Sequence, residues 1–594
     1  MDRTIRLGYS HGSGVISGIF YRLLPVQILL MVLSSINTII DGLFASNCIS
    51  LVAMDATGLF APVNGVISAI GAVMLGGSQI LCGNFMGKNQ DEATNGVFSL
   101  DMVVITVLGA ILTLTCLFFS SPLALLLGAK GAVADELALY IWGISFGFVP
   151  MMISTQLSAF LQMENEQKRT YIGIAAMMVS NTLFDWLFIV QMDLGMLGLG
   201  LASSLSNLVF VFVLLSRYFS GKTSMHFSLK LIAWKQLGKV IYIGLPGAIT
   251  TFCLSVKWTL YNYLLTNYGG DGALGAYAAF SSLGAFFFAI TAGIGTTTRL
   301  LASVYVSERD RTSLIETMKV ALIQGGLMVT AFSVLIILCA VPLTRIYYRD
   351  AALPVYGLTI SLLRINAISI PLSEISYVIQ SYYQCRGRMK IVNAIAIADG
   401  LVASGLMALV LTPPFGAVGL WWSIVANGVI CLGIVIVYSM IVMKRFPRSF
   451  TDFIGLEEEF GVPESDRLDM VAFGMDEVMN LSETVITFCT QKGLDPKRAY
   501  YAGLCLEEMA GNIVLHGFNK DNKKHAVDMR VVYEEDQLTI RLSDNCRAFN
   551  PKERAEIFNP DDITKNIGVR MVARIAKSMQ YQHMLGLNVL TMVI

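Results

Sequence analysis

Charged residues are scarce in this chain. Asp, Glu, Lys and Arg make up 14% of its 594 residues, whereas ordinary soluble domains carry roughly 25%. Basic and acidic residues number 42 each, so the formal net charge is zero. The high apolar content excludes a disordered chain, and the missing excess of basic residues argues against a nucleic-acid partner. Because 55% of the residues are hydrophobic, most of the chain requires a lipid bilayer.

Cysteine pairs and a transport-motor motif are missing as well. The ten cysteines form no Cys-x-x-Cys spacing and most lie in apolar runs, which predicts reduced, buried side chains without disulfides or zinc. No G-x-x-x-x-G-K-[ST] phosphate loop occurs, which excludes a P-loop motor. We expect no cleavable signal peptide, because the first apolar run, near residues 15–44, has the length of a full membrane span.

The balanced total charge conceals two halves of opposite sign. Residues 1–445 have a net charge of +6, and residues 446–594 have a net charge of −6. The long apolar runs also stop at this boundary, which predicts a membrane domain followed by a soluble domain. The predicted parts are an N-terminal cytoplasmic segment (1–14), a first six-helix bundle (15–220), an inter-bundle linker (221–236), a second six-helix bundle (237–445), a linker (446–464) and a cytoplasmic domain (465–594).

Twelve apolar runs have the length of membrane spans. Their approximate limits are 17–45, 56–82, 97–120, 138–162, 168–191, 195–217, 237–265, 275–305, 318–342, 355–381, 390–413 and 416–442. Nineteen Lys and Arg residues lie in the N-terminal segment, in alternate connections and just after the last run, against three in the other connections. This asymmetry predicts a multi-pass protein of the plasma membrane with both termini in the cytoplasm.

The two halves of the membrane domain resemble each other at a spacing of about 221 residues. Three pairs of marks recur: Leu24-Pro25 with Leu245-Pro246, Gly195-x-x-Gly198-Leu199 with Gly416-x-x-Gly419-Leu420, and Gln162…Lys168 with Gln384…Lys390. Six spans per repeat give the repeats the same topology, so their symmetry axis is expected along the membrane normal. Two parallel six-helix bundles around a central cavity are typical of transporters with alternating access.

Four oxygen-bearing side chains are expected at one depth of the first bundle. Asp41 and Asp185 lie late in spans that run outward, and Asn181 lies one helical turn below Asp185. Ser203, in the returning sixth span, reaches a comparable level. Two carboxylates with neutral oxygens suit Na⁺, with Asp41 and Asp185 as its metal ligands, or they can hold a proton. Structural pairing between helices is the alternative.

The second bundle carries different ionisable residues. Asp41 corresponds to Asn262 in the second repeat, so coupling to an ion is predicted in the first bundle alone. Lys257, Glu374 and Asp399 lie at membrane depth and are candidates for lining a substrate cavity. Internal pairing is an equally good interpretation of these three residues. The depths do not favour a direct pair between Lys257 and Glu374.

The soluble domain alternates helical and strand patterns. Residues 497–517 have helical periodicity, with Glu508, Asn512 and His516 on one face. Residues 526–533 and 537–543 are predicted to be strands, and the second runs into a polar loop that begins at Asp544. A helix over 568–579 and a last strand over 588–594 complete an α+β sandwich.

The membrane domain resembles the multidrug and toxic compound extrusion (MATE) family over residues 15–445. The resemblance is carried by Asp41-Gly42, Gly76-Gly77-Ser78, Met86-Gly87-Lys88-Asn89…Ala93, Asn181-x-x-x-Asp185, Gly195-x-x-Gly198-Leu199-Gly200-Leu201-Ala202-Ser203, Gly244-Leu245-Pro246 and Tyr382-Tyr383-Gln384-Cys385-x-Gly387. It implies an all-α polytopic fold of twelve transmembrane helices and ion-coupled export. It also points to Asp41, Asn181, Asp185 and Ser203 as coupling residues, with Ser203 standing where Thr is commoner.

The soluble domain resembles the GHKL ATP-binding fold, in particular its branch of anti-sigma-factor-like serine kinases. Three boxes carry this resemblance: Glu508-x-x-x-Asn512-x-x-x-His516-Gly517, Asp544-x-Cys546-x-x-Phe549-Asn550-Pro551 and Asn566-Ile567-Gly568-Val569. The resemblance implies that Glu508 is a catalytic carboxylate and that Asn512 ligates Mg²⁺. It implies that Asn512, Asp544, Phe549 and Gly568 bind the nucleotide. Cys546 departs from the family, which has Gly there, and a Cβ would be costly if the backbone were left-handed.

Together these patterns predict a sodium- or proton-coupled secondary efflux transporter for small amphipathic or cationic organic compounds. The cytoplasmic domain is predicted to regulate it, with Mg-ATP as a possible cofactor and a cytoplasmic regulatory protein as a possible partner. Whether this domain is also an enzyme, a serine kinase or ATPase, stays open. Two alternatives remain: a membrane-tethered anti-sigma-type serine kinase or partner switch whose spans serve as a sensor, and a flippase for lipid-linked sugars.

Overall fold

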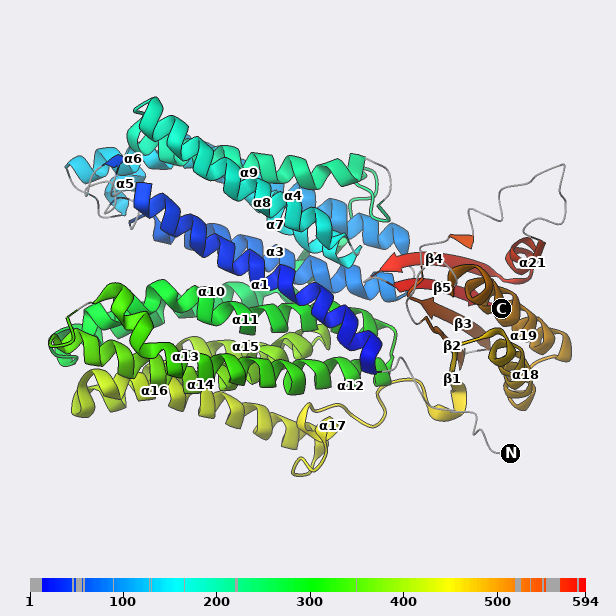
Figure 1. Ribbon diagram of the computed structural model, residues 1–594. Helices are drawn as coiled ribbons and strands as arrows, with labels where there is room; N and C mark the ends of the chain where they lie inside the picture. Colours follow the sequence, from blue (N-terminus) through cyan, green and yellow to red (C-terminus); the bar gives the residue numbers. More distant parts are fainter. Residues whose placement is uncertain are drawn as a thin grey trace.

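A long helical domain carries an α+β domain against one of its ends in the computed structural model (Figure 1). We call this end of the helical domain the domain-side end. The structure describes residues 13–44, 48–49, 56, 59–88, 90–127, 129, 131–164, 166–219, 223–348, 350–518, 525–534, 536–546, 550–551, 567–584 and 587–594.

The first bundle is formed by helices from the first third of the chain. Its elements are α1 (Ser13–Phe44), α3 (Ala61–Gly87), α4 (Asp91–Phe118), α5 (Ser120–Leu126), α6 (Ala132–Ser145), α7 (Phe148–Met163), α8 (Gln167–Asp185), the π-helix η2 (Trp186–Gln191) and α9 (Gly195–Phe219). Helix α1 packs against α8 of its own bundle and also against α11 of the second bundle, so it lies between the two.

The second bundle repeats this arrangement. Its elements are the short η3 (Trp234–Gln236), α10 (Leu237–Tyr268), α11 (Ala273–Ser307), α12 (Arg311–Lys319), the π-helix η4 (Val320–Gly325), α13 (Gly326–Tyr347), α14 (Pro354–Cys385), α15 (Met389–Ile397), the π-helix η5 (Ala398–Val402) and α16 (Ala403–Met443). Pro25 in α1 and Pro246 in α10 both lie inside long helices, at the equivalent positions that the repeat predicts.

Wherever the structure describes them, the twelve predicted spans fall on helices. Within the described residues, nine helices are long and apolar enough to cross a membrane, or ten when the bent pair α6 and α7 counts as one span. One of the nine runs from Met389 to Met443, and its 55 residues would measure about 80 Å as one helix, far more than the roughly 30 Å of a bilayer core. Gly416 breaks this run with φ 59° and ψ −145°, which divides it into two spans. Helix α1 supplies the remaining span.

Small residues bring the two bundles into close contact. A Cβ at Gly77 of α3 would collide with the backbone carbonyl of Val240 in α10. A Cβ at Gly244 of α10 would likewise collide with the carbonyl of Val73 in α3. The hydrophobic effect does not drive helices together in lipid. Close approach of two backbones instead stabilises their contact through dispersion attraction. The α3–α10 contact is therefore a tightly packed seam between the bundles.

The segment after the last span is folded onto the second bundle. It includes α17 (Phe450–Phe453), and Ile454 and Leu456 are both fully buried. The Arg386 guanidinium lies 4.1 Å from the centre of the Phe460 ring, and it forms an ion pair of 2.8 Å with Glu457. We call residues 449–462 the strap, because they fasten the C-terminal domain to the second bundle.

Within the described residues, the elements of the C-terminal domain form one antiparallel sheet, three longer helices and the short 3-10 helix η6. Its elements are η6 (Glu464–Asp466), β1 (Arg467–Ala472), α18 (Met475–Gln491), α19 (Pro496–Gly517), β2 (Val527–Glu534), β3 (Gln537–Asp544), α21 (Ile567–Ile575), β4 (Ser578–Met584) and β5 (Leu587–Val593). The strand order is β1-β2-β3-β5-β4. The predicted helix over 568–579 was wrong at its end: α21 stops at Ile575 and residues 578–584 form β4, whose polar residues Gln580 and Gln582 obscure the strand pattern.

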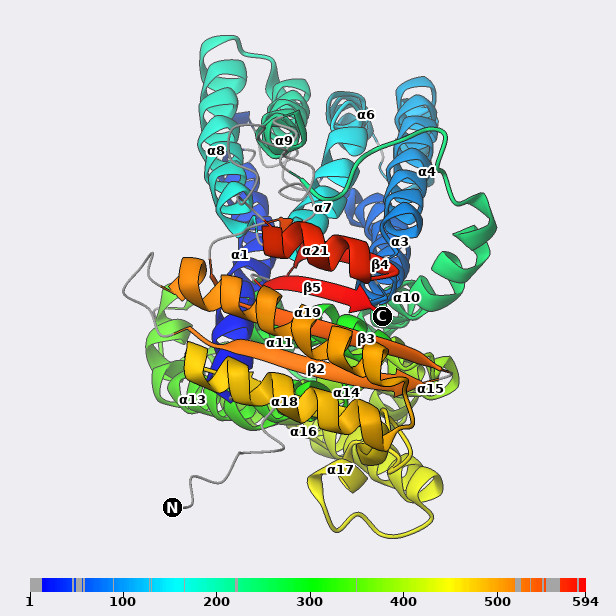
Figure 2. The ribbon, with the colours of Figure 1, turned by 90° about the vertical axis from the view of Figure 1, so that its right-hand side faces the viewer.

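The two faces of this sheet have different partners. Leu538, Ile540 and Leu542 of β3 point toward the helices and belong to the core of the domain. Arg541, between them, points to the opposite face, as the period of two requires. Figure 2 shows the helices α18, α19 and α21 on the viewer's side of the sheet and the membrane helices behind it. The polar face of the sheet therefore lies on the membrane domain.

Candidate functional site

The first candidate site joins α1, α8 and α9 of the first bundle. Ser203 of α9 donates a hydrogen bond of 3.2 Å to Oδ2 of Asp41 near the end of α1. Asn181 and Asp185 lie one turn apart on α8, and both are fully buried. Asp185 is close enough to Asp41 for the two carboxylates to interact electrostatically, and Tyr140 of α6 lies near both. The structure thus brings together the four residues that the sequence predicts.

Several polar atoms of this cluster have no protein partner. Within the described residues, Oδ1 of Asp41, both carboxylate oxygens of Asp185 and both amide atoms of Asn181 are buried without a hydrogen bond. A buried carboxylate without a partner costs several kcal/mol unless it binds a cation or a proton. The cluster is therefore chemically suited to hold a proton or a hard cation.

The composition of the cluster limits which cation it can hold. Among the described residues, no group of three or more His, Cys, Asp or Glu side chains is arranged to hold a metal ion. A cation between Asp41 and Asp185 would complete its shell with neutral oxygens, such as those of Asn181 and Ser203. Oxygen-only ligation suits Na⁺ and disfavours a transition metal. The π-helix η2 begins directly after Asp185, and such local widening of a helix is frequent at functional sites.

A further buried carboxylate lies in the same bundle. Asp101 of α4 is fully buried, and Ser78 of α3 donates a hydrogen bond of 2.6 Å to its Oδ1. This contact ties α3 to α4. Sequence reasoning assigned no role to Asp101, and its membrane depth and the nearby Gly76-Gly77-Ser78 motif are the only signals that pointed to it.

The ionisable residues of the second bundle do not form one cluster. Lys257 of α10 donates to the backbone carbonyl of Asp399 at 3.4 Å, and the carboxylate of Asp399 accepts a hydrogen bond of 2.8 Å from Asn427. Glu374 of α14 is fully buried, and neither of its carboxylate oxygens has a partner within the described residues. In the same residues, Lys257 and Glu374 form no ion pair. Asp399 is thus held inside the bundle by Asn427, whereas Glu374 stands apart.

The second candidate site lies at the end of the C-terminal domain where α19 meets α21. Glu508 and Asn512 are both half-buried on α19, one turn apart. A Cβ at Gly568, at the start of α21, would collide with the carboxylate of Glu508. Gly568 therefore allows the amino end of α21 to approach Glu508. The arrangement places a carboxylate, a potential Mg²⁺ ligand and a helix amino terminus, which favours phosphate, close together.

Asp544 lies at the end of β3 and is held in place by β5. Its Oδ1 accepts a hydrogen bond of 2.7 Å from the side-chain amide of Asn588 and one of 2.8 Å from the backbone N–H of Cys546. Burial raises the pKa of Asp544, and the hydrogen bonds from Asn588 and Cys546 oppose this shift. Asn588 in turn accepts from the hydroxyl of Tyr581 at 2.9 Å. Sequence reasoning missed Asn588, although an Asn inside the apolar last strand was a signal.

The glycine position taken by Cys546 is not strained. Cys546 is not among the non-glycine residues with positive φ in the described part of the chain. Its backbone is therefore not left-handed, and its Cβ causes no strain of that kind. Its side chain packs against Gly517 at the end of α19, where a Cβ would lie 2.9 Å from the Cys546 sulfur. Phe549 and Asn566 of the predicted boxes lie outside the described residues.

Two repeated bundles of membrane helices, with paired carboxylates in one of them, define a polytopic transporter fold. The chain matches the MatE family over residues 27–187 and 246–406, one match in each bundle. Because these two matches cover more than half of the chain, the protein belongs to the MatE family. Residues 475–594 match the family described as Histidine kinase-like ATPase domain.

Characterised relatives agree with this assignment. The membrane domain is 23% identical over 433 residues to the Multidrug export protein MepA of Staphylococcus saprophyticus, a match that covers 72% of this chain and 94% of that protein. It is 24% identical over 446 residues to MepA of Staphylococcus haemolyticus, covering 73% of this chain and 96% of that protein.

Solved structures show the same fold. A MATE transporter of Vibrio cholerae superposes with a TM-score of 0.66 at 16% identity, over 73% of this chain and 98% of that one. A MOP superfamily transporter from Pyrococcus furiosus superposes with a TM-score of 0.64 at 20% identity, over 71% of this chain and 96% of that one.

Proposed function

We propose that this protein is a secondary efflux transporter of the plasma membrane that couples export to the inward movement of Na⁺ or H⁺. The observation that carries the proposal is the pair Asp41 and Asp185, whose carboxylates have buried oxygens without a hydrogen-bond partner within the described residues. A site that binds an ion from one side and releases it to the other needs such exchangeable ligands. Ser203 and Asn181 supply the neutral oxygens around the pair.

The substrates we propose are small amphipathic or cationic organic compounds. The MepA relatives are named as multidrug export proteins, and the match covers nearly their whole length. The candidate cavity residues Lys257, Glu374 and Asp399 lie in the second bundle. The contact of Asp399 with Asn427 favours a structural role for Asp399, whereas the free carboxylate of Glu374 makes it the better candidate for contact with a cationic substrate or a proton.

We place the domain-side end in the cytoplasm. The connections on this side carry most of the basic loop residues, as the positive-inside rule requires for cytoplasmic loops. The C-terminal domain lies on the same side and is proposed to bind Mg-ATP and to regulate transport. Asn512 would hold the metal, Gly568 would present the amino end of α21 to phosphate, and Asp544 would accept a hydrogen bond from the adenine amino group.

A phosphoryl-transfer activity of this domain is a second candidate. It is favoured by the position of Glu508, which lies one turn from Asn512 and against Gly568. A carboxylate there is placed to orient an attacking hydroxyl toward a bound phosphate. A kinase of this kind would act on a cytoplasmic regulatory protein.

Dye export from reconstituted liposomes tests the coupling site. We expect a Na⁺ or H⁺ gradient to drive export by the wild type and Asp41→Asn to abolish it, because Asn keeps the volume of the side chain but removes its titratable, cation-binding charge. The matched control is Asp193→Asn, which neutralises an exposed carboxylate of the same bundle whose φ of 52° Asn tolerates. Full transport by a stably folded Asp41→Asn variant would contradict the assignment.

A further inference from the structure

One side chain of the C-terminal domain contacts both bundles. Arg541 of β3 donates a hydrogen bond of 2.9 Å to the backbone carbonyl of Gly87, at the end of α3 in the first bundle. The same guanidinium forms an ion pair of 2.9 Å with Glu308, at the end of α11 in the second bundle. Gly87 and Glu308 are 221 residues apart, so they occupy the same position in the two repeats. Arg541 therefore bridges equivalent turns of the two bundles.

The Arg541 contacts are shielded from water. The side chains of Arg541 and Glu308 are only 17% and 8% exposed. Charged hydrogen bonds with this burial are worth more than the small contributions of exposed ion pairs. The planar guanidinium can also donate in two directions at once, which the point charge of a lysine cannot do in the same fixed geometry.

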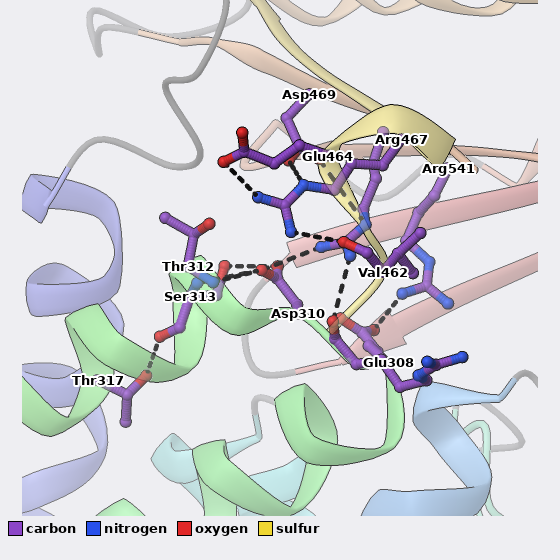
Figure 3. A network of polar contacts seen from close by, with 12 residues as sticks. Glu308, Asp310, Thr312, Ser313, Thr317, Val462, Glu464, Arg467, Asp469 and Arg541 are labelled. Carbon is purple, nitrogen blue, oxygen red and sulfur yellow. Dashed lines mark hydrogen bonds and ion pairs between the residues drawn. The ribbon is translucent and has the colours of Figure 1, made fainter. Parts of the chain in front are cut away.

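The C-terminal domain is fastened firmly to the second bundle. Arg530 of β2 forms an ion pair of 3.0 Å with Asp310. Asp310 in turn caps α12 by accepting hydrogen bonds from the backbone N–H groups of Thr312 and Ser313 (Figure 3). The strap adds its buried residues and the ion pair of Glu457 with Arg386. Because of these contacts and the continuous chain through the strap, we expect the C-terminal domain to move with the second bundle.

The contacts with the first bundle are of a different kind. Besides Arg541, Gln582 of β4 donates a hydrogen bond of 2.5 Å to Asp91 at the start of α4. Leu587 and Val589 of β5 belong to a hydrophobic cluster that includes residues of both bundles. No covalent connection runs from the first bundle to this domain except through the second. These contacts can therefore separate if the bundles move apart.

The bundles themselves meet beneath Arg541. A Cβ at Gly83 of α3 would collide with the hydroxyl of Ser303 in α11, and a Cβ at Gly87 would collide with the hydroxyl of Ser307. Helices α3 and α11 are thus in close contact at the domain-side end. A motion that separates the two bundles at this end moves Gly87 away from Glu308. Arg541 then loses one of its two partners in the membrane domain, while its contact of 3.4 Å with Thr591 of its own sheet can persist.

We propose that the polar face of the C-terminal sheet is a latch that stabilises the conformation closed at the domain-side end. The latch consists of Arg541 and Gln582, is mounted on the second bundle by Arg530 and the strap, and holds the first bundle at Gly87 and Asp91. A contact made in one of two conformations shifts their ratio by its free energy. The inference deepens the proposed transport function, since it names how the C-terminal domain would regulate the alternating states.

Distances between spin labels on the full-length protein test the latch. Labels are placed at Lys168→Cys and Lys390→Cys, which are exposed, lie on the domain-side end of different bundles, and correspond to each other in the repeat. Cys48, the only exposed cysteine within the described residues, is first replaced by Ser. The tested variant is Arg541→Gln. Its matched control is Arg498→Gln, which removes an arginine that contacts Asp536 and the chain end within the C-terminal domain.

We expect Arg541→Gln to raise the ratio of long to short distances about tenfold, which corresponds to about 1.4 kcal/mol. Gln582→Ala is expected to shift it in the same direction, and Arg541→Lys to shift it less than Arg541→Gln. The Arg498→Gln control should leave the ratio unchanged. Equal distance distributions for Arg541→Gln, Gln582→Ala and the control would overturn the latch.

This readout separates the latch from the proposed transport function. It requires no ion gradient, substrate or nucleotide, so a shifted distance ratio supports the latch even if export is not ion-coupled. Conversely, ion-driven export by a protein whose distances do not respond to Arg541→Gln would leave the transport function standing and remove the latch. Cooperative thermal unfolding of Arg541→Gln at the wild-type temperature confirms that the variant is folded.

Discussion

Asn588 of β5 donates a hydrogen bond of 2.7 Å to the carboxylate of Asp544 at the end of β3. This contact fixes the side chain that the GHKL resemblance assigns to adenine. It also places the candidate nucleotide site next to the latch, because Asn588 pairs with His583 on β4 and the adjacent Gln582 contacts Asp91. The candidate nucleotide site and the contact with the first bundle therefore involve adjacent residues of β4, His583 and Gln582.

Replacing Asn588 tests the nucleotide site. We expect Asn588→Ala to weaken the binding of Mg-ATP about tenfold, because Asp544 loses a charge-assisted hydrogen bond worth roughly 1.5–3 kcal/mol. Calorimetry on the full-length protein measures the affinity. Asn480→Ala, on the exposed face of α18, is the matched control and should bind like the wild type. Equal affinities for Asn588→Ala and the wild type would show that Asp544 does not read the nucleotide.

The metal requirement tests a different residue. Asn512→Ala should remove the part of ATP binding that depends on Mg²⁺ and leave binding in EDTA unchanged, since the amide oxygen is the proposed ligand. Titrations with and without Mg²⁺ compare the two. An undiminished Mg²⁺ dependence in Asn512→Ala would place the metal elsewhere.

Packing between Cys546 and Gly517 predicts a pair of compensating substitutions. Gly517→Ala should destabilise the C-terminal domain by about 1–3 kcal/mol, because the new Cβ would lie 2.9 Å from the Cys546 sulfur. Cys546→Gly in the same chain should restore most of the loss. Thermal unfolding of the two single variants and the double variant forms the test. Additive losses in the double variant would show that the two side chains do not compete for space.

The backbone conformation of Cys546 changes an expectation about affinity. The sequence suggested that Cys546 weakens nucleotide binding through backbone strain. Because Cys546 is not among the described residues with positive φ, that source of strain is absent. We therefore expect Cys546→Gly by itself to change the affinity for Mg-ATP by less than about threefold, well below the tenfold that 1.4 kcal/mol of strain would produce.

The sequence predicts some features of this molecule well for identifiable physical reasons. Asp41 and Asp185 are visible in the sequence because placing a carboxylate at membrane depth costs free energy. The same cost favours polar neighbours for them, such as Ser203, which donates a hydrogen bond to Asp41. The strand over Leu538–Leu542 was visible because its alternation has a period of two. The same period shows that Arg541 lies on the other face, but periodicity does not reveal what covers a face. The docking of the sheet therefore required the structure.

Other features escaped because local patterns were ambiguous. The polar residues of β4 do not mark an apolar face, so the sequence predicts a continuation of α21 in its place. The acidic residues Glu457, Glu458 and Glu459 predict a linker, yet Ile454 and Leu456 just before them are fully buried in the strap. An acidic run can either face solvent or dock on a basic surface of the membrane domain, and the sequence does not distinguish these two cases. The partners of Glu457, Arg386 and Arg388, lie about 70 residues away in the chain, so no local pattern reveals the contact.

Truncation of the C-terminal domain should have different effects depending on where the chain is cut. A protein ending at residue 464 keeps the strap, and we expect it to fold, to export along an ion gradient, and to spend more time open at the domain-side end because the latch is gone. A protein ending at residue 455 loses Leu456, which is fully buried, and Glu457, which pairs with Arg386 and Arg388. Removing one partner leaves two half-buried arginines uncompensated, so this shorter protein should unfold at a lower temperature.

Thermal unfolding and liposome export, measured on both truncated proteins, separate structure from regulation. Export by the protein ending at residue 464, with altered dependence on ATP, is the expected result. A folded protein of this length that exports nothing under any ion gradient would show that the C-terminal domain belongs to the transport machinery itself. Equal stability of the two truncated proteins would show instead that the strap does not hold the end of the second bundle together.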